Sequence, residues 1–240
     1  MFSLFGRGGK GVVPPRLGSR RGGSAARVSR VNLDELTPDI LHFLGQAAYI
    51  QLCTFETLSR AVVTAPTTQA KETISHVASL SLTKHHGLVD EIVKRGADPG
   101  DVMEPFTAAT EEFGRVTLGN DWYEILVTSY ITAGILDDFF VHLAAGLPDG
   151  YPERITALLS GDNGGKLIVG LLRDAIDANP HLASRLALWG RRLVGDTLLV
   201  ARSALPLADR GADEDEKLEP VFTELIAAHT RRMDELGLTA

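Results

Sequence analysis

The stretch from Ile40 to Val63 constrains the fold most strongly. Its apolar residues recur at the spacing of one helix face over about six turns. An amphipathic helix of that length buries its apolar face against other helices in a bundle. Near its centre one carboxylate, Glu56, stands among apolar neighbours. Such a residue is either an ordinary side chain at the edge of the buried face or a metal ligand that points into the core.

Further helical segments follow along the chain, and Thr37 and Pro38 are predicted to begin the first one as N-cap and first helical residue. No segment alternates apolar and polar residues as a strand does, so we expect no sheet. The predicted architecture is all-α: an up-down bundle of four long helices with an extra C-terminal helix. The later helices are expected at 68–95, 106–113, 122–145, 152–160, from 166 with a break or kink at Pro180, and at 214–236.

The charge distribution divides the chain into a basic tail and an acidic body. Residues 1–30 carry seven Arg and Lys side chains and no acid, so the net charge of −7 for the whole chain leaves −14 on the rest. We predict that residues 1–32, rich in Gly, Arg, Ser and Pro, are a disordered tail, and that 33–240 are the helical domain. The tail is either a solubilising segment or a contact for nucleic acid or an anionic surface; the lack of aromatic residues among its arginines favours the first.

The cysteine content and the apolar runs suggest a compartment. A single cysteine, Cys53, excludes an internal disulfide and suits a reducing cytoplasm, so we expect a cytoplasmic protein. Cys53 lies mid-helix among apolar residues, which is typical of a small buried side chain. The N-terminus does not read as a signal peptide, and no uninterrupted apolar run is long enough for a membrane span.

Five residues are candidate metal ligands in the predicted bundle. A di-iron carboxylate bundle needs one carboxylate from each of two helices and a Glu-x-x-His from each of the other two. The chain lacks that complete set: Leu82 and Thr83 stand three residues before the paired histidines. We therefore expect no cofactor, or iron if an intact site forms from other ligands. The candidates are Glu56, His85, His86, Asp137 and Asp138.

Six stretches of the chain carry distinctive motifs: 94–99 (KRGADP), 103–106 (MEPF), 121–124 (DWYE), 138–140 (DFF), 185–195 (RLALWGRRLVG) and 229–233 (HTRRM). Together they resemble an actinobacterial family of ferritin-like proteins related to the tRNA 2-methylthio-isopentenyladenosine hydroxylase, and the resemblance covers about residues 40–238. It implies a ferritin-like bundle and, in catalytic relatives, a di-iron site that hydroxylates its substrate with dioxygen.

The family's metal ligands carry over only in part. Glu56 matches the carboxylate of the first bundle helix, and the second helix keeps an imidazole within Ser81–His86 but not the acid. The acidic position of the third helix falls at Ala133, near Gly134. The His and Glu expected in the fourth helix fall on Gly164 and its neighbours. The resemblance therefore implies the fold together with degenerate di-iron ligands.

Two functions follow as hypotheses. The first is a non-catalytic protein of this fold that acts through a protein partner, with the basic tail as an adaptor. The second is a di-iron hydroxylase that acts on a modified tRNA nucleoside or a small substrate. A homodimer is compatible with both.

Overall fold

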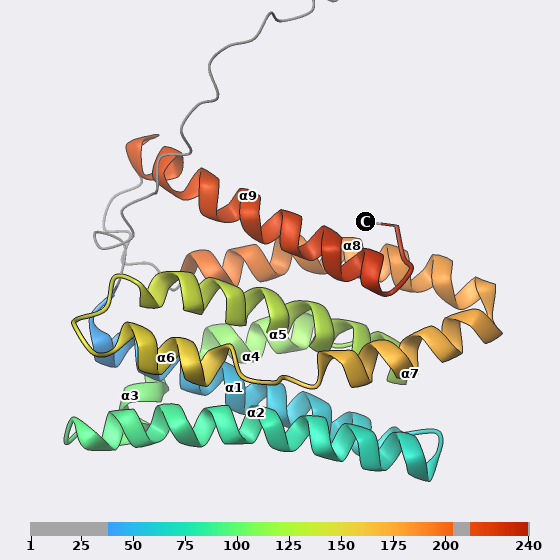
Figure 1. The fold of residues 1–240 in the computed structure, drawn as a ribbon, viewed down its shortest axis with the longest axis horizontal. Coiled ribbons are helices and arrows are strands. Elements are labelled where there is room, and N and C mark those ends of the chain that lie inside the picture. The colour runs from blue at the N-terminus through green and yellow to red at the C-terminus, as the bar shows by residue number, and fades with distance from the viewer. Residues whose placement is uncertain (1–37, 204–211, 240) are drawn as a thin grey trace, which may run out of the picture. The chain divides into compact units, whose positions relative to one another are not determined.

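The computed structural model describes residues 38–203 and 212–239, and for 212–218 it describes the backbone alone. Within these ranges the secondary structure is helical and contains no strand, which confirms the predicted all-α fold (Figure 1). The predicted basic tail, Thr37 and the predicted break at 206–211 lie outside the described residues.

The first two helices form an antiparallel hairpin, α1 (Ile40–Thr64) and α2 (Thr68–Lys94). The predicted start of α1 is two residues early, because Asp39 is the N-cap and its Oδ2 accepts from the Leu41 amide at 3.3 Å. Thr67 caps α2 by accepting from the Ala70 amide. Gly96 follows the end of α2 with φ of 75°, the left-handed conformation expected of a glycine just past a helix end.

A crossing segment packs against α1 before the chain enters its central helix. It consists of α3 (Pro99–Met103), the 3₁₀ helix η2 (Glu104–Phe106) and α4 (Thr107–Val116), where the sequence predicts one short helix. The segment approaches α1 closely at Gly45, where an added Cβ would lie 2.3 Å from the carbonyl oxygen of Val102. A glycine at this position therefore lets α3 contact the backbone of α1.

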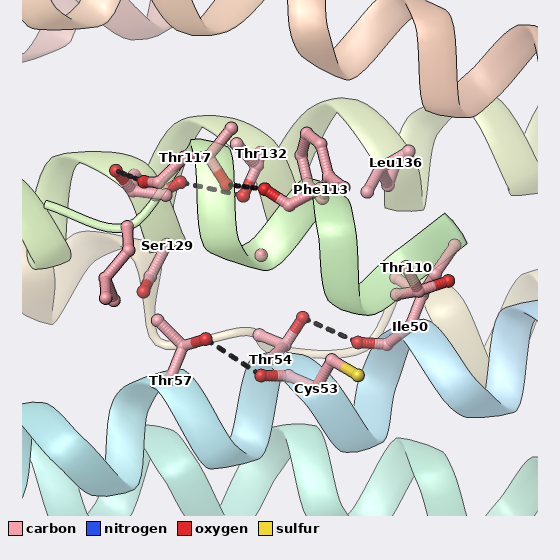
Figure 2. A pocket seen from close by; sticks show the side chains of 13 residues that line it. Ile50, Cys53, Thr54, Thr57, Thr110, Phe113, Thr117, Ser129, Thr132 and Leu136 are labelled. Carbon is pink, nitrogen blue, oxygen red and sulfur yellow. Dashed lines mark hydrogen bonds between the residues drawn. The ribbon is translucent and has the colours of Figure 1, made fainter. Parts of the chain in front are cut away.

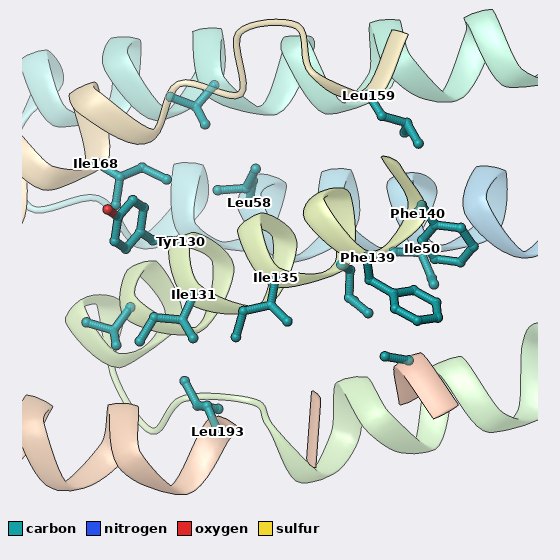
Figure 3. Close-up of a cluster of buried hydrophobic side chains, with 14 of the residues drawn as sticks. Ile50, Leu58, Tyr130, Ile131, Ile135, Phe139, Phe140, Leu159, Ile168 and Leu193 are labelled. Carbon is teal, nitrogen blue, oxygen red and sulfur yellow. The ribbon is translucent and has the colours of Figure 1, made fainter. Parts of the chain in front are cut away.

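Helix α5 (Trp122–Ala144) is the centre of the fold, and 18 of its 23 residues are buried. Asp121 caps it by accepting from the Glu124 amide at 3.0 Å, as predicted. Figure 3 shows Ile131 and Ile135 of α5 pointing toward Leu193, while Leu58 of α1 lies on the other side. By length and composition α5 is apolar enough to span a membrane, but 72% of its most apolar window is buried inside the protein, as in the core helix of a bundle.

The fourth helix of the bundle is interrupted. Helices α6 (Pro152–Leu159) and α7 (Gly165–Ala178) lie end to end, and both contact α2 and α5 (Figure 1). The short helix predicted at 152–160 and the helix start predicted near 166 are therefore the two halves of one bundle position. The link 160–164 that separates them lies beside the centre of the bundle.

The remaining helices cover the far side of α5. The chain reverses at Pro180, which begins a separate helix, α8 (Pro180–Ser203), rather than kinking the preceding one (Figure 1). Both α8 and α9 (Ala212–Glu235) contact α5. The predicted all-α four-helix bundle is confirmed: it consists of α1, α2, α5 and the α6–α7 pair, and both α8 and α9 are additional to it.

Candidate functional site: a buried lysine–aspartate pair

The five predicted ligands do not come together in the structure. Glu56 is exposed, because it is rotated by roughly 200° about α1 from both Thr54 and Leu58, which face inward. His86 is exposed on α2 for the same reason, since Lys84 and Leu88 are the buried residues on either side of it. Of the two interpretations of Glu56, its exposure fits an ordinary helix side chain, and neither Glu56 nor His86 faces the centre of the bundle.

The other three predicted residues have protein partners. His85 is buried, and its Nδ1 lies 2.9 Å from the carbonyl oxygen of Ala48 on α1. Asp138 forms an ion pair with Arg232 of α9 at 2.7 Å. Asp137 alone lies in the centre of the bundle, where sequence analysis placed a metal ligand.

The partner of Asp137 is a lysine. The Nζ atom of Lys84 on α2 donates to Oδ2 of Asp137 on α5 at 2.7 Å, and the two residues are 5% and 7% exposed. The Nε2 atom of Gln51 on α1 donates to the other carboxylate oxygen, Oδ1, also at 2.7 Å. The three side chains thus join three helices of the bundle through a hydrogen-bonded pair of opposite charges.

The interruption of the fourth helix completes this centre. Leu159 is the last residue of α6, so its carbonyl has no acceptor role within the helix, and Nζ of Lys84 donates to it at 2.7 Å. The ammonium of Lys84 is therefore bonded to one carboxylate and one backbone carbonyl. Because α6 ends before the break at 160–164, the carbonyl of Leu159 can accept from Lys84. In a continuous helix that carbonyl would accept from a backbone amide of the same helix.

Gly164 is required where α7 begins. Its φ of 70° is a left-handed conformation, and an added Cβ would lie 2.6 Å from a methyl group of Val77 on α2. The amides of Gly164 and Gly165 donate to the side chains of Asp162 and Asn163, at 2.8 and 2.9 Å. Residues 162–165 therefore form a turn that is held by these two hydrogen bonds and packs against α2. The family resemblance expects metal ligands at this place.

The electrostatics of the centre rest on one positive and one negative side chain. Burial raises the pKa of Asp137, and the neighbouring Lys84 and Gln51 partly offset that rise. Ala133, one turn before Asp137, has no side-chain ligand to offer, and the side chain of Arg232 covers Gly134. Among the described residues, no group of three or more His, Cys, Asp or Glu side chains is placed to hold a metal ion. The residues present do not fit a di-iron centre.

A solvent-filled hollow reaches the edge of the pair. It has a volume of about 480 Å³ and lies between α5 and the α6–α7 link, with Asp137, Asp138, His142 and Lys166 among its lining residues. The space on the inner side of the pair, next to Lys84 and Gln51, measures only about 10 Å³, which is room for a single water at most. Asp137 therefore borders a space that is open to water and protons, and Lys84 is not among the residues that line that space.

Sequence analysis missed Lys84 and Gln51. The signal for Lys84 was its position, because it falls on the buried stripe of α2 at helical spacing between Val77, Ser81 and Leu88. A lysine on such a stripe needs a buried counter-charge. Its partner lies 53 residues away in the sequence, and nothing local in the chain identifies it.

The chain matches a protein-family model. A family model described as a ferritin-like domain of actinomycetes matches residues 34–222, well over half of the chain. No curated protein matches the chain. The match supports the predicted fold family, whereas the relation to the tRNA-modifying hydroxylase stays a prediction.

Proposed function

Because the chain belongs to the ferritin-like domain family of actinomycetes, we propose that it is a member without a di-iron site that acts by binding rather than by oxidation. One observation carries this proposal. At the centre of the bundle, where ferritin-like proteins hold metal between carboxylates and histidines, Lys84 pairs with Asp137 at 2.7 Å. The lysine supplies the positive charge that a metal supplies elsewhere.

Charge balance supports the same conclusion. Two ferrous ions bring four positive charges, which di-iron proteins balance with several carboxylates. Here one carboxylate, Asp137, faces the centre and is already balanced by Lys84. A metal ion beside the ammonium of Lys84 would meet repulsion in a region of low dielectric, where it is weakly screened.

The alternative function is dioxygen-dependent hydroxylation of a modified tRNA nucleoside or small substrate. It follows from the family resemblance, and it requires ligands beyond those that the described residues bring together. It predicts iron in the purified protein and loss of that iron in Glu56→Ala. Our proposal predicts that Glu56→Ala changes nothing in metal content, since Glu56 is exposed.

The deciding experiment is the metal content of the full chain after expression in iron-supplemented medium, measured by plasma mass spectrometry. We expect far less than one iron per chain from a sample whose circular dichroism shows a folded helical protein. About two irons per chain, removed by Asp137→Asn but not by the exposed control Asp90→Asn, would overturn the proposal and favour the hydroxylase.

We also propose that the basic tail, residues 1–32, takes part in binding the partner. Residues 1–30 carry a charge of +7 and the remainder −14, so the tail is suited to an anionic partner. Deletion of residues 1–32 is expected to reduce recovery of that partner in a pull-down at low salt. Equal recovery with and without the tail would remove the adaptor part and leave the proposal for the metal-free centre untouched.

A further inference from the structure

A second cavity lies outside the lysine–aspartate centre. It has a volume of about 50 Å³ and lies between α1, α4 and α5, lined by Ile50, Cys53, Thr54, Thr57, Thr110, Phe113, Gly114, Thr117, Leu118, Thr128, Ser129, Thr132 and Leu136 (Figure 2). We call this cavity the hydroxyl pocket, after the Ser and Thr side chains in its lining. Thr54 and Ser129 line both the hydroxyl pocket and the small space beside Lys84. They separate the two, so the hydroxyl pocket is a distinct site.

The lining of the hydroxyl pocket contains no charged side chain and seven hydroxyl groups. Six of these donate their proton to a backbone carbonyl: Thr54 to Ile50, Thr57 to Cys53, Thr117 to Phe113, Thr128 to Thr117, Ser129 to Ile125 and Thr132 to Thr128. Figure 2 shows several of these bonds directed back along the chain. A hydroxyl that has used its proton remains an acceptor, so the wall offers acceptors and methyl groups.

Thr110 on α4 is the exception among the seven. It is 5% exposed, and within the described part of the chain its hydroxyl has no hydrogen-bond partner. The oxygen of Thr110 is not among the fully buried polar atoms that lack a partner, so it is accessible from the pocket, where water or a ligand can bond it. Thr110 can therefore donate one hydrogen bond to an occupant of the pocket.

Cys53 adds a neutral thiol to the wall. Burial, and then the nearby Glu56, raise the pKa of Cys53 to about 11, so it carries no charge near neutral pH. No charged side chain lines the hydroxyl pocket. An ionic ligand would lose its hydration there without a counter-charge in the lining, since Glu56 and Glu111, whose charges act on Cys53, lie outside the lining.

We infer that the hydroxyl pocket binds a small, uncharged aliphatic molecule that carries a hydroxyl group. The methyl groups and the side chains of Ile50, Phe113 and Leu136 suit a short alkyl body. The ligand hydroxyl donates to one of the threonine oxygens whose own proton already bonds a backbone carbonyl, and it accepts from Thr110. The volume of about 50 Å³ admits only a few heavy atoms, since a cavity of roughly 150 Å³ is needed for benzene. This site is independent of the proposed absence of metal.

The test is a titration of the full chain with 1-propanol, followed by NMR of ¹³C-labelled threonine methyl groups. We expect saturable shifts at the six threonines of the pocket and none at Thr83, whose hydroxyl also bonds a backbone carbonyl but lies exposed on α2. Propylammonium, which replaces the hydroxyl by a charge at equal chain length, is expected to give no saturable shift. Shifts that stay linear in alcohol, or that reach Thr83 equally, would overturn the inference.

Two variants assign the hydrogen bond. Thr110→Val keeps the shape of the side chain and removes its donor, and we expect the affinity for 1-propanol to fall roughly three- to tenfold, the effect of one neutral hydrogen bond. The matched control Thr83→Val should leave the affinity unchanged.

Alkylation of Cys53, the single cysteine, by N-ethylmaleimide gives an independent readout. In the wild type, 1-propanol should slow this alkylation at concentrations that do not slow alkylation of free glutathione. Unchanged affinity in Thr110→Val together with an unprotected Cys53 contradicts the site.

Discussion

Helix α2 carries two ion-paired residues, Lys84 and Glu91, that lie seven residues, about two turns, apart and whose partners differ in their exposure to water. Lys84 pairs with Asp137, and their side chains are 5% and 9% exposed. Glu91 pairs with Arg154 of α6, and their side chains are 5% and 48% exposed. Glu91 also pairs with Lys94, which is 60% exposed. Both members of the Lys84–Asp137 pair are largely shielded from water, whereas both cations that pair with Glu91 are well exposed to it.

This difference in exposure sets what each pair contributes. A buried pair gives little net stability when complete, because both charges lose their hydration, but an unpartnered member is strongly unfavourable. A cation on the surface is hydrated whether or not it is paired, so its carboxylate partner gains a modest, screened attraction. The Lys84–Asp137 pair therefore specifies how α2, α5 and α1 meet, and the Glu91 pairs add stability to the α2–α6 contact.

The largest expected effect is that of Lys84→Met, which removes one buried charge and leaves Asp137 without its cation. We expect the free energy of unfolding to fall by about 3 kcal/mol, near the lower end for a broken buried pair, since the raised pKa of Asp137 lets its carboxyl take up a proton instead of remaining charged. Urea denaturation followed by circular dichroism measures the change.

The double variant Lys84→Met/Asp137→Leu is the control for that prediction. With both charges gone, the apolar replacements should recover part of the lost stability, because no buried charge is left unpaired. The recovery is partial because the Gln51 amide and the Leu159 carbonyl lose their hydrogen-bond partners. If the double variant were as unstable as the sum of the two single variants, the two residues would act independently and the pair would not be the organising contact of the centre.

Glu91→Gln is expected to have a smaller effect that depends on pH. Burial alone would raise the pKa of Glu91, but the hydrogen bonds and charges of Lys94 and Arg154 outweigh it, so the pKa is lowered from its ordinary value of 4.5. A lowered folded-state pKa means that the stabilisation is complete above 4.5 and is lost as the pH falls through the folded pKa. We expect a loss of about 1 kcal/mol at pH 7, limited by screening of the two cations.

Melting temperatures of wild type and Glu91→Gln between pH 7 and pH 3 measure this. The two curves should draw together as the pH falls below 4.5, because protonation removes the charge by which Glu91 pairs with Lys94 and Arg154. A constant difference across the range would show that the loss in Glu91→Gln comes from packing and not from the ion pairs.

The helices could be predicted from the sequence because their signals are local. Asp121 at the start of α5, Gly96 after α2 and the proline that begins α8 each act on the residues next to them. The centre could not be predicted in the same way. Rotation about α1 decides whether Glu56 or its neighbours face inward, and the identity of the partner of Asp137 depends on the pairing of helices far apart in the chain. Histidines and acids suggested metal, while the residue on the buried stripe was a lysine.

The exposed pair Arg115–Glu112 on α4 is the ion pair whose loss we expect to change stability least. The guanidinium Nη2 lies 2.5 Å from Glu112 Oε1 and a second bond joins Nε to Oε2, so its geometry is at least as close as that of Lys84–Asp137. Both side chains are mostly exposed, at 71% and 58%, so water and salt screen the attraction. Arg115→Ala should therefore leave the urea midpoint within error of the wild type at physiological salt. If its effect equalled that of Glu91→Gln, contact geometry rather than exposure would rank the ion pairs of this protein, and the large effect expected for Lys84 would need another cause.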